Sequence, residues 1–208
     1  MNLEALRALA LTGGDWVIYL LLASSVVTGA VIIERAVVLA RELRWLDELR
    51  RRVVGRLAME DLAVVAKEAA KVPGLASRVL RAGLAEAAQG AAVVEEHMAA
   101  EGLAGRQAVE TRLLILGTMG NNAPFVGLFG TVLGVIRAFH DLAQNTNAGP
   151  ETVMAGLSEA LIATAVGLFV AIPSVIAYNY FQKRVKDLLA GMESIDRLLL
   201  ARLKTPAK

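Results

Sequence analysis

The stretch APFVGLFGTVLG, residues 123–134, decides the fold. It is apolar enough to lie in a lipid bilayer, yet it contains Pro124, Gly127, Gly130, Gly134 and a single hydroxyl at Thr131. Glycine and proline weaken an isolated helix. In a bilayer, however, helices associate through close packing, and small residues let their backbones approach. We therefore expect a membrane helix here that packs against neighbouring helices through its glycines. The neighbouring helices also make Pro124 tolerable.

The composition predicts an integral membrane protein. The chain has 208 residues, 56% of them hydrophobic, and a mean hydropathy of +0.53, which is high for a soluble domain. Three segments are uncharged or nearly so over the roughly 20 residues that a span requires: 16–33, 113–136 and 153–181. We expect an all-α protein with three transmembrane helices and long helical extensions into the cytoplasm.

The basic residues predict the orientation. Most Lys and Arg residues lie between positions 35 and 112 or after position 182, and residues 138–182 contain none. By the positive-inside rule, the N-terminus lies outside and the C-terminus in the cytoplasm. The predicted segments are an outer N-terminal segment (1–15), a first span (16–34), a cytoplasmic helical domain (35–112), a second span (113–139), an outer loop (140–151), a third span (152–181) and a cytoplasmic helix and tail (182–208).

The cytoplasmic segment is expected to be helical throughout. A helix should continue directly from the first span, a second should stop before Pro73-Gly74, and a third should cover residues 76–88. After Gly90 no proline interrupts the chain, so we expect one helix to run into the second span. The run Arg50-Arg51-Arg52 is typical of a solvated helix face or of contact with anionic membrane lipid, and it has no nucleic-acid-binding module beside it.

The third span repeats the small-residue pattern with Ala163, Gly167 and Pro173, so it too should face protein more than lipid. It also carries Glu159, and a charged carboxylate inside a bilayer costs about 2.5 kcal/mol or more. Glu159 could pair with Arg137, near the outer end of the second span, and fix the packing of two helices. Alternatively, it could line a hydrated ion pathway. Both interpretations stay open.

Thr131 and Thr164 each lie near the middle of a span. Each hydroxyl could bond back to the carbonyl one turn earlier, a common arrangement for threonine in membrane helices. Alternatively, the two could face a shared lumen as polar contacts for a proton or hydrated cation. A proton relay needs titratable groups, and these spans offer Glu159 beside threonines that do not titrate. If ions cross here, another chain must supply the carrier.

Other chemistry lacks sequence support. The chain has no cysteine, and His97 and His140 stand apart without a metal-binding motif, so we expect no metal and no cofactor. No GxSxG motif accompanies the histidines, so no catalytic residue is assigned and an enzyme is not expected.

Two segments closely resemble the MotA/TolQ/ExbB proton-channel family. They are APFVGLFGTVLGVIRAF and, after a short loop, GLSEALIATAVGLFVAIPSVIAYNYF, and the strong resemblance covers residues 113–186. The end of the first span, IIERAVVL, resembles the family's first helix. The three-span plan is more similar to the ExbB/TolQ branch than to four-span MotA. The chain departs from the usual pattern at Asn121-Asn122 and at Arg137.

The resemblance implies a proton-motive-force-driven molecular motor in the bacterial inner membrane, with the N-terminus periplasmic. Five copies would form a homopentamer around a single-span ExbD- or TolR-like partner, whose membrane aspartate carries the proton. A TonB- or TolA-like protein would pass the work to the envelope, as in TonB-dependent import or protein transport. Thr131 matches the family's pore threonine in the GLFGT motif, Thr164 matches the threonine of the EALxATAxG motif, and Glu159 matches the glutamate of that motif. The alternatives are a scaffold that clamps a partner helix without conducting ions, and a gliding or stator motor relative.

Overall fold

The structure, a computed structural model, describes residues 11–144 and 150–204, and those residues contain helices and no strand. The helices are α2 (Asp15–Met59), α3 (Leu62–Ala69), α4 (Leu75–Ala85), the 3₁₀ turn η1 (Ala87–Gln89), α5 (Ala91–Glu110), α6 (Leu113–Gln144) and α7 (Pro150–Lys204). The all-α prediction is confirmed. Parts of the predicted N-terminal segment, outer loop and tail lie outside the described residues.

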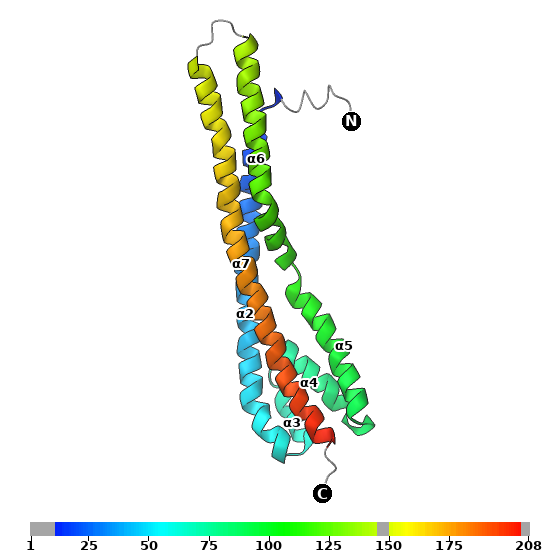
Figure 1. Cartoon of the computed structure of the whole chain (residues 1–208). Helices are drawn as coiled ribbons and strands as arrows, with labels where there is room; N and C mark the ends of the chain where they lie inside the picture. Colours follow the sequence, from blue (N-terminus) through cyan, green and yellow to red (C-terminus); the bar gives the residue numbers. More distant parts are fainter. Residues whose placement is uncertain (1–10, 145–149, 205–208) are drawn as a thin grey trace. The chain divides into compact units, whose positions relative to one another are not determined.

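Three of these helices are long and apolar enough to cross a membrane: α2, α6 and α7 (Figure 1). This confirms the three predicted spanning helices. α2 has 45 residues and α7 has 55, far more than the roughly 20 that a span requires. The helix predicted to continue from the first span is therefore also confirmed.

The chain divides into two compact units, which we describe separately. The span unit comprises the described residues of Met1–Ile33 and Arg112–Asn179, and the extension unit those of Glu34–Thr111 and Tyr180–Lys208. In the span unit, a small core forms from all three long helices, and its buried members are Val17, Leu21, Ala123, Leu133, Val170 and Ala171. Large side chains such as Phe125 and Phe169 lie on the outside.

The extension unit has a core of leucine, valine and isoleucine, among them the fully buried Leu49, Leu80 and Leu188. Its short helices begin at recognisable caps. Asp61 accepts a hydrogen bond from the Ala63 amide at the start of α3. The Glu42 carboxylate of α2 accepts one from the Leu75 amide at 2.8 Å and so fixes the start of α4.

The continuous helix expected from Gly90 into the second span is wrong, because the chain breaks between α5 and α6. Thr111 takes an extended conformation (φ −50°, ψ 139°), and Arg112 has φ +69°, in the left-handed region that non-glycine residues seldom occupy. The Thr111 hydroxyl and amide both donate to the Gln107 carbonyl, at 2.7 and 3.0 Å. These two bonds give the Gln107 carbonyl its donors at the end of α5, and they stabilise the break in the helix.

Candidate ion-pathway site

α6 and α7 approach each other closely at two glycines. A Cβ atom added to Gly127 would lie 2.7 Å from the Ala163 carbonyl oxygen, and one added to Gly167 would lie 2.6 Å from the Ala123 carbonyl oxygen. Both neighbours are backbone atoms, which cannot move aside as a side chain can. The two helices can therefore hold this separation only with glycine at both positions.

The contact continues along α6 towards its C-terminal end and also includes α2. A Cβ atom on Gly134 would lie 2.6 Å from the Ala160 Cβ, and one on Gly130 would meet both the Ala163 Cβ and the Val17 side chain of α2. Gly130 therefore lies where the three helices meet. The small residues singled out in the sequence thus lie at helix contacts within one chain, as close packing in a bilayer requires.

The two prolines lie inside the long helices, Pro124 in α6 and Pro173 in α7. Pro124 is half-buried next to the buried Ala123, whereas Pro173 is exposed. Beside Pro173, the fully buried Ser174 donates its hydroxyl hydrogen bond to the Val170 carbonyl at 2.6 Å. This local bond satisfies the buried Ser174 hydroxyl within its own helix.

Thr131 of α6 and Thr164 of α7 lie together at the tight contact. Their hydroxyl oxygens are 2.5 Å apart, and both side chains are half-buried. The Thr131 hydroxyl also lies within bonding distance of the Gly127 carbonyl one turn earlier, at 3.2 Å, and of the Ala160 carbonyl across the contact, at 3.3 Å. A hydroxyl has one proton to donate. The Thr131 proton therefore has a choice of acceptors on two helices.

A polar cavity of about 230 Å³ lies at the end of the span unit where α2 begins, and Glu159 lines it. The residues around it come from all three spanning helices: Gly14, Asp15, Ile18, Gly134, Arg137, Ala138, Asp141, Gly156, Glu159, Ala160 and Ala163. Glu159 is exposed and immediately precedes Ala160, the residue whose carbonyl approaches Thr131. The structure therefore brings the carboxylate close to the threonine pair, on the side where α2 begins.

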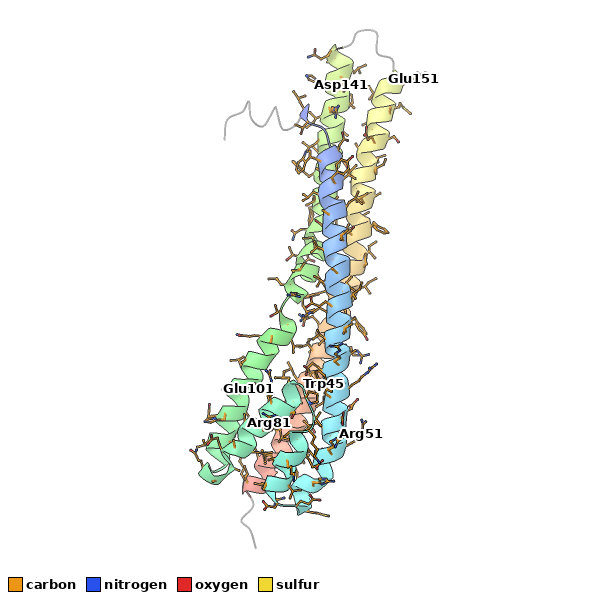
Figure 2. All side chains as sticks on the ribbon, turned by 180° about the vertical axis from the view of Figure 1, so that it is seen from behind. Trp45, Arg51, Arg81, Glu101, Asp141 and Glu151 are labelled. Carbon is orange, nitrogen blue, oxygen red and sulfur yellow. The ribbon has the colours of Figure 1, made fainter. Side chains whose placement is uncertain are left out.

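Arg137 lines the same cavity, but it forms no ion pair with Glu159 among the described residues. Its guanidinium lies 3.6 Å from the Asp15 carboxylate and 3.9 Å from the Asp141 carboxylate. Asp141 lies four residues further along α6 (Figure 2). Gly13 gives the guanidinium room, since a Cβ atom there would lie 2.5 Å from its Nη1. Arg137 thus connects the start of α2 to α6 through its ion pairs, and the Glu159 side chain lines the cavity.

Sequence reasoning missed a second polar cavity of about 310 Å³, at the part of the α6–α7 contact where α6 begins. It is lined by Leu114, Gly117, Thr118, Asn121, Asn122, Val175, Tyr178 and Asn179. The Asn122 side chain donates to the Thr118 carbonyl at 2.9 Å. The spacing of Thr118, Asn121 and Asn122 by three and four residues is the signal that could have revealed this polar face.

No group of three or more His, Asp or Glu side chains that could hold a metal ion is found in residues 11–144 and 150–204. What these residues offer is a pair of hydroxyls with a carboxylate on one side and amides on the other. Such groups can exchange hydrogen bonds with water or with a passing proton, but the threonines cannot store the charge.

A sequence model of the MotA/TolQ/ExbB proton channel family matches residues 71–194, more than half of the chain. The chain belongs to this family. The match begins before the segments on which the resemblance rested, so the family pattern also includes α4 and α5, and it covers Thr131, Thr164 and Glu159.

Two groups of curated relatives are similar to this family member. The Tol-Pal system protein TolQ of Pseudomonas aeruginosa is 52% identical over 81 residues, which are 39% of this chain and 35% of the relative. The biopolymer transport protein ExbB of Aquifex aeolicus is 45% identical over 84 residues, 40% of this chain and 57% of the relative. ExbB of Neisseria gonorrhoeae is 42% identical over 88 residues, 42% and 40% of the two chains. The matches therefore span between about a third and three fifths of these relatives.

Proposed function

We propose that this chain is an ExbB/TolQ-like subunit of a proton-driven motor in the bacterial inner membrane. The observation that carries the proposal is the pair of threonine hydroxyls, 2.5 Å apart beside the glycine contact of α6 and α7. In a family of proton channels, a polar contact in the middle of otherwise apolar spans is the natural place for the ion to pass.

The proposal assigns the carrier to another chain. Threonine does not titrate, and Glu159 is the titratable group that lines the outer cavity from the third span. A relay normally needs a series of such groups. We therefore propose that five copies of this chain surround a single-span ExbD- or TolR-like partner, whose membrane aspartate accepts the proton next to Thr131 and Thr164. A TonB- or TolA-like protein would receive the work.

The proposed topology places the N-terminus and the loop between α6 and α7 in the periplasm. The extension unit and the C-terminus would lie in the cytoplasm, because they carry most of the basic residues. The names of the relatives, TolQ and ExbB, support this branch of the family for the present chain. They also favour work on the cell envelope as the outcome of proton flow.

The test is proton flux through the chain, reconstituted in liposomes with its co-purifying single-span partner, under an imposed pH gradient. Thr131→Val and Thr164→Val keep the side-chain volume and remove the hydroxyl, so we expect flux to fall by roughly tenfold or more for each lost contact with the ion. The matched control is Ser24→Ala in α2, because among the described residues that hydroxyl bonds only to the Leu20 carbonyl of its own helix, at 2.8 Å. The control should conduct like the wild type.

Size-exclusion chromatography of each variant separates conduction from assembly. Variants that assemble normally yet conduct poorly support the pathway. Wild-type flux in both threonine variants would contradict it. A wild-type complex that binds its partner but carries no flux would favour the scaffold that clamps a partner helix.

A further inference from the structure

The second polar cavity of the span unit, between α6 and α7 where α6 begins, is lined by neutral polar groups. We call it the amide cavity, and its polar members are Thr118, Asn121 and Asn122 of α6 and Tyr178 and Asn179 of α7. None of the described residues that line it is Asp, Glu, Lys, Arg or His. By contrast, the cavity beside Glu159 contains three carboxylates and an arginine. The two polar cavities therefore offer an ion different surroundings.

The carboxamides of the amide cavity lie within an apolar span. Asn121 is eight residues after Leu113, where α6 begins, which is about 12 Å along the helix axis. Asn121, Asn122 and Asn179 are all exposed in the single chain. A polar side chain that faces hydrocarbon loses its hydrogen bonds to water, which is costly. This face of the span unit is therefore covered by water or by another protein chain.

The carboxamides are only partly satisfied inside the chain. Asn122 donates to the Thr118 carbonyl at 2.9 Å, which leaves its side-chain oxygen as an acceptor. Asn121 has no hydrogen-bond partner in residues 11–144 and 150–204. The cavity volume of about 310 Å³ has room for several water molecules, since each occupies about 30 Å³ in the liquid. Water in the cavity would satisfy these groups, so the lining favours a hydrated cavity over a dry helix contact.

The amide cavity lies toward the same side of α6 as the threonine pair. Asn121 precedes Thr131 by ten residues, about 15 Å along the axis, and the two positions differ by less than a quarter turn about it. Between them the two helices are closely packed, since a Cβ atom on Gly127 would lie 2.7 Å from the Ala163 carbonyl oxygen. An ion therefore has no route between the helices of one chain, and it can reach Asn121 only along the exposed side of α6.

We propose that the amide cavity is a hydrated chamber through which the ion is released, and that Asn121 and Asn122 keep it hydrated. This inference rests on the proposed function, because it follows the ion from the threonine pair toward the proposed cytoplasmic side. Amide dipoles replace part of a cation's hydration shell but bind it more weakly than a carboxylate does, and conduction requires sites that an ion can leave. Since Asn121-Asn122 departs from the usual family pattern, this release chamber is a feature of the present chain.

The chain contains no cysteine, so single introduced cysteines can report directly on water in the amide cavity. Asn121→Cys and Asn122→Cys are each expressed in the full chain with its co-purifying partner, in inside-out membrane vesicles. A membrane-impermeant cationic methanethiosulfonate is added, and mass spectrometry of this chain measures the labelled fraction over time. The reagent reacts with a thiolate, which apolar surroundings suppress. We expect both thiols to react readily from the proposed cytoplasmic side.

The matched control is Val26→Cys in α2. Val26 is 72% exposed, lines neither polar cavity, and precedes Ile33 at the end of the uncharged run of α2 by seven residues, or about 10 Å. We expect this thiol to react roughly tenfold more slowly than the two cavity thiols, or slower still. Equal rates at all three positions would overturn the proposal. Two cavity thiols as slow as the control would also overturn it, since the amides would then contact another protein helix.

Two substitutions test the role of the Asn121 carboxamide in release. Asn121→Leu keeps a similar volume and removes the polar group, so it should slow the labelling of Asn122→Cys in the same chain and reduce proton flux, each by roughly tenfold or more. Asn121→Ser retains a hydrogen-bonding group and should restore both. Size-exclusion chromatography establishes that each variant assembles. Wild-type flux in Asn121→Leu would overturn the release role, and equal losses in the Leu and Ser variants would show a purely structural role.

The labelling rates are measured without an ion gradient, so the two proposals fail separately. A complex that labels rapidly but carries no flux loses the proposed function and with it the release role, although its cavity is hydrated. A complex that conducts but labels slowly keeps the proposed pathway and loses the release chamber.

Discussion

The two units of this chain differ in the side chains that lie at their helix contacts. In the span unit, glycine and alanine occupy the helix contacts, and Phe125 and Phe169 lie outside at 69% and 73% exposure. In the extension unit, Leu49 and Leu188 are fully buried, and the surface carries ion pairs such as Arg52–Glu48. One chain therefore follows two packing rules.

The difference shows how the solvent selects the core. Burying a leucine away from water lowers the free energy because apolar surface leaves water. Moving the same leucine from lipid into a helix contact gives no such gain, so close approach of backbones decides instead. The fully buried leucines of the extension unit are the core expected for a unit surrounded by water. The glycine contacts of the span unit are the contacts expected for helices surrounded by lipid.

The largest effect is expected at the α6–α7 contact. Gly127→Leu would place a side chain against backbone atoms that lie 2.7 to 3.2 Å from its Cβ, so we expect α6 and α7 to separate and the assembled protein to be lost. The control is Gly29→Leu in α2, where a Cβ atom meets nothing within 4 Å. Size-exclusion chromatography and thermal melting measure both. If Gly127→Leu assembles like Gly29→Leu, the close-packing rule does not describe the span unit.

A smaller effect is expected in the core of the extension unit. Leu199 is fully buried, whereas its neighbour Leu198 is 42% exposed. Leu199→Ala removes buried methyl groups and leaves a cavity, so it should reduce the free energy of unfolding by about 2–5 kcal/mol. Leu198→Ala should reduce it by less than about 1 kcal/mol. Denaturant unfolding of the two variants compares them directly, and equal losses would mean that burial does not stabilise this unit.

The smallest effect concerns pH and Asp196 of the extension unit. Burial, and secondarily the negative charge of Glu193, raises the pKa of Asp196 to about 7 from the usual 3.8. The folded state therefore binds this proton more tightly than the unfolded state does, so stability falls as the pH rises from about 4 to about 7. Asp196→Asn should remove this fall and add roughly 1–3 kcal/mol at pH 8.

Thermal melting at several pH values between 4 and 8 measures this effect. The cavity beside Asp196 is also lined by other charged side chains: Glu95, Arg106, Arg197 and Lys204. The variant leaves these four unchanged, so a difference between the two pH profiles reports on Asp196. A variant whose melting temperature follows pH as steeply as that of the wild type would show that another group is responsible.

Much of the candidate site could be predicted from the sequence, because composition and spacing reveal apolar spans and small residues. Thr131 and Thr164 could be placed near mid-span in this way. Their contact could not, since it depends on how far α6 and α7 are rotated about their own axes, and only packing fixes that rotation. The ion pair of Arg137 with Asp15 could not be predicted for a similar reason. Asp15 lies far away in the sequence and reaches Arg137 only in the folded chain.

The sequence by itself determined that the chain is helical, that three of its helices can span a membrane, and which residues are small enough to lie between them. These properties follow from local composition and periodicity. The tertiary structure decided where α5 ends, since neither Thr111 nor Arg112 is a glycine or a proline that would mark a break. It also decided which polar groups meet, because the acceptors of a hydroxyl or a guanidinium come from helices that are distant in sequence and become neighbours only through packing.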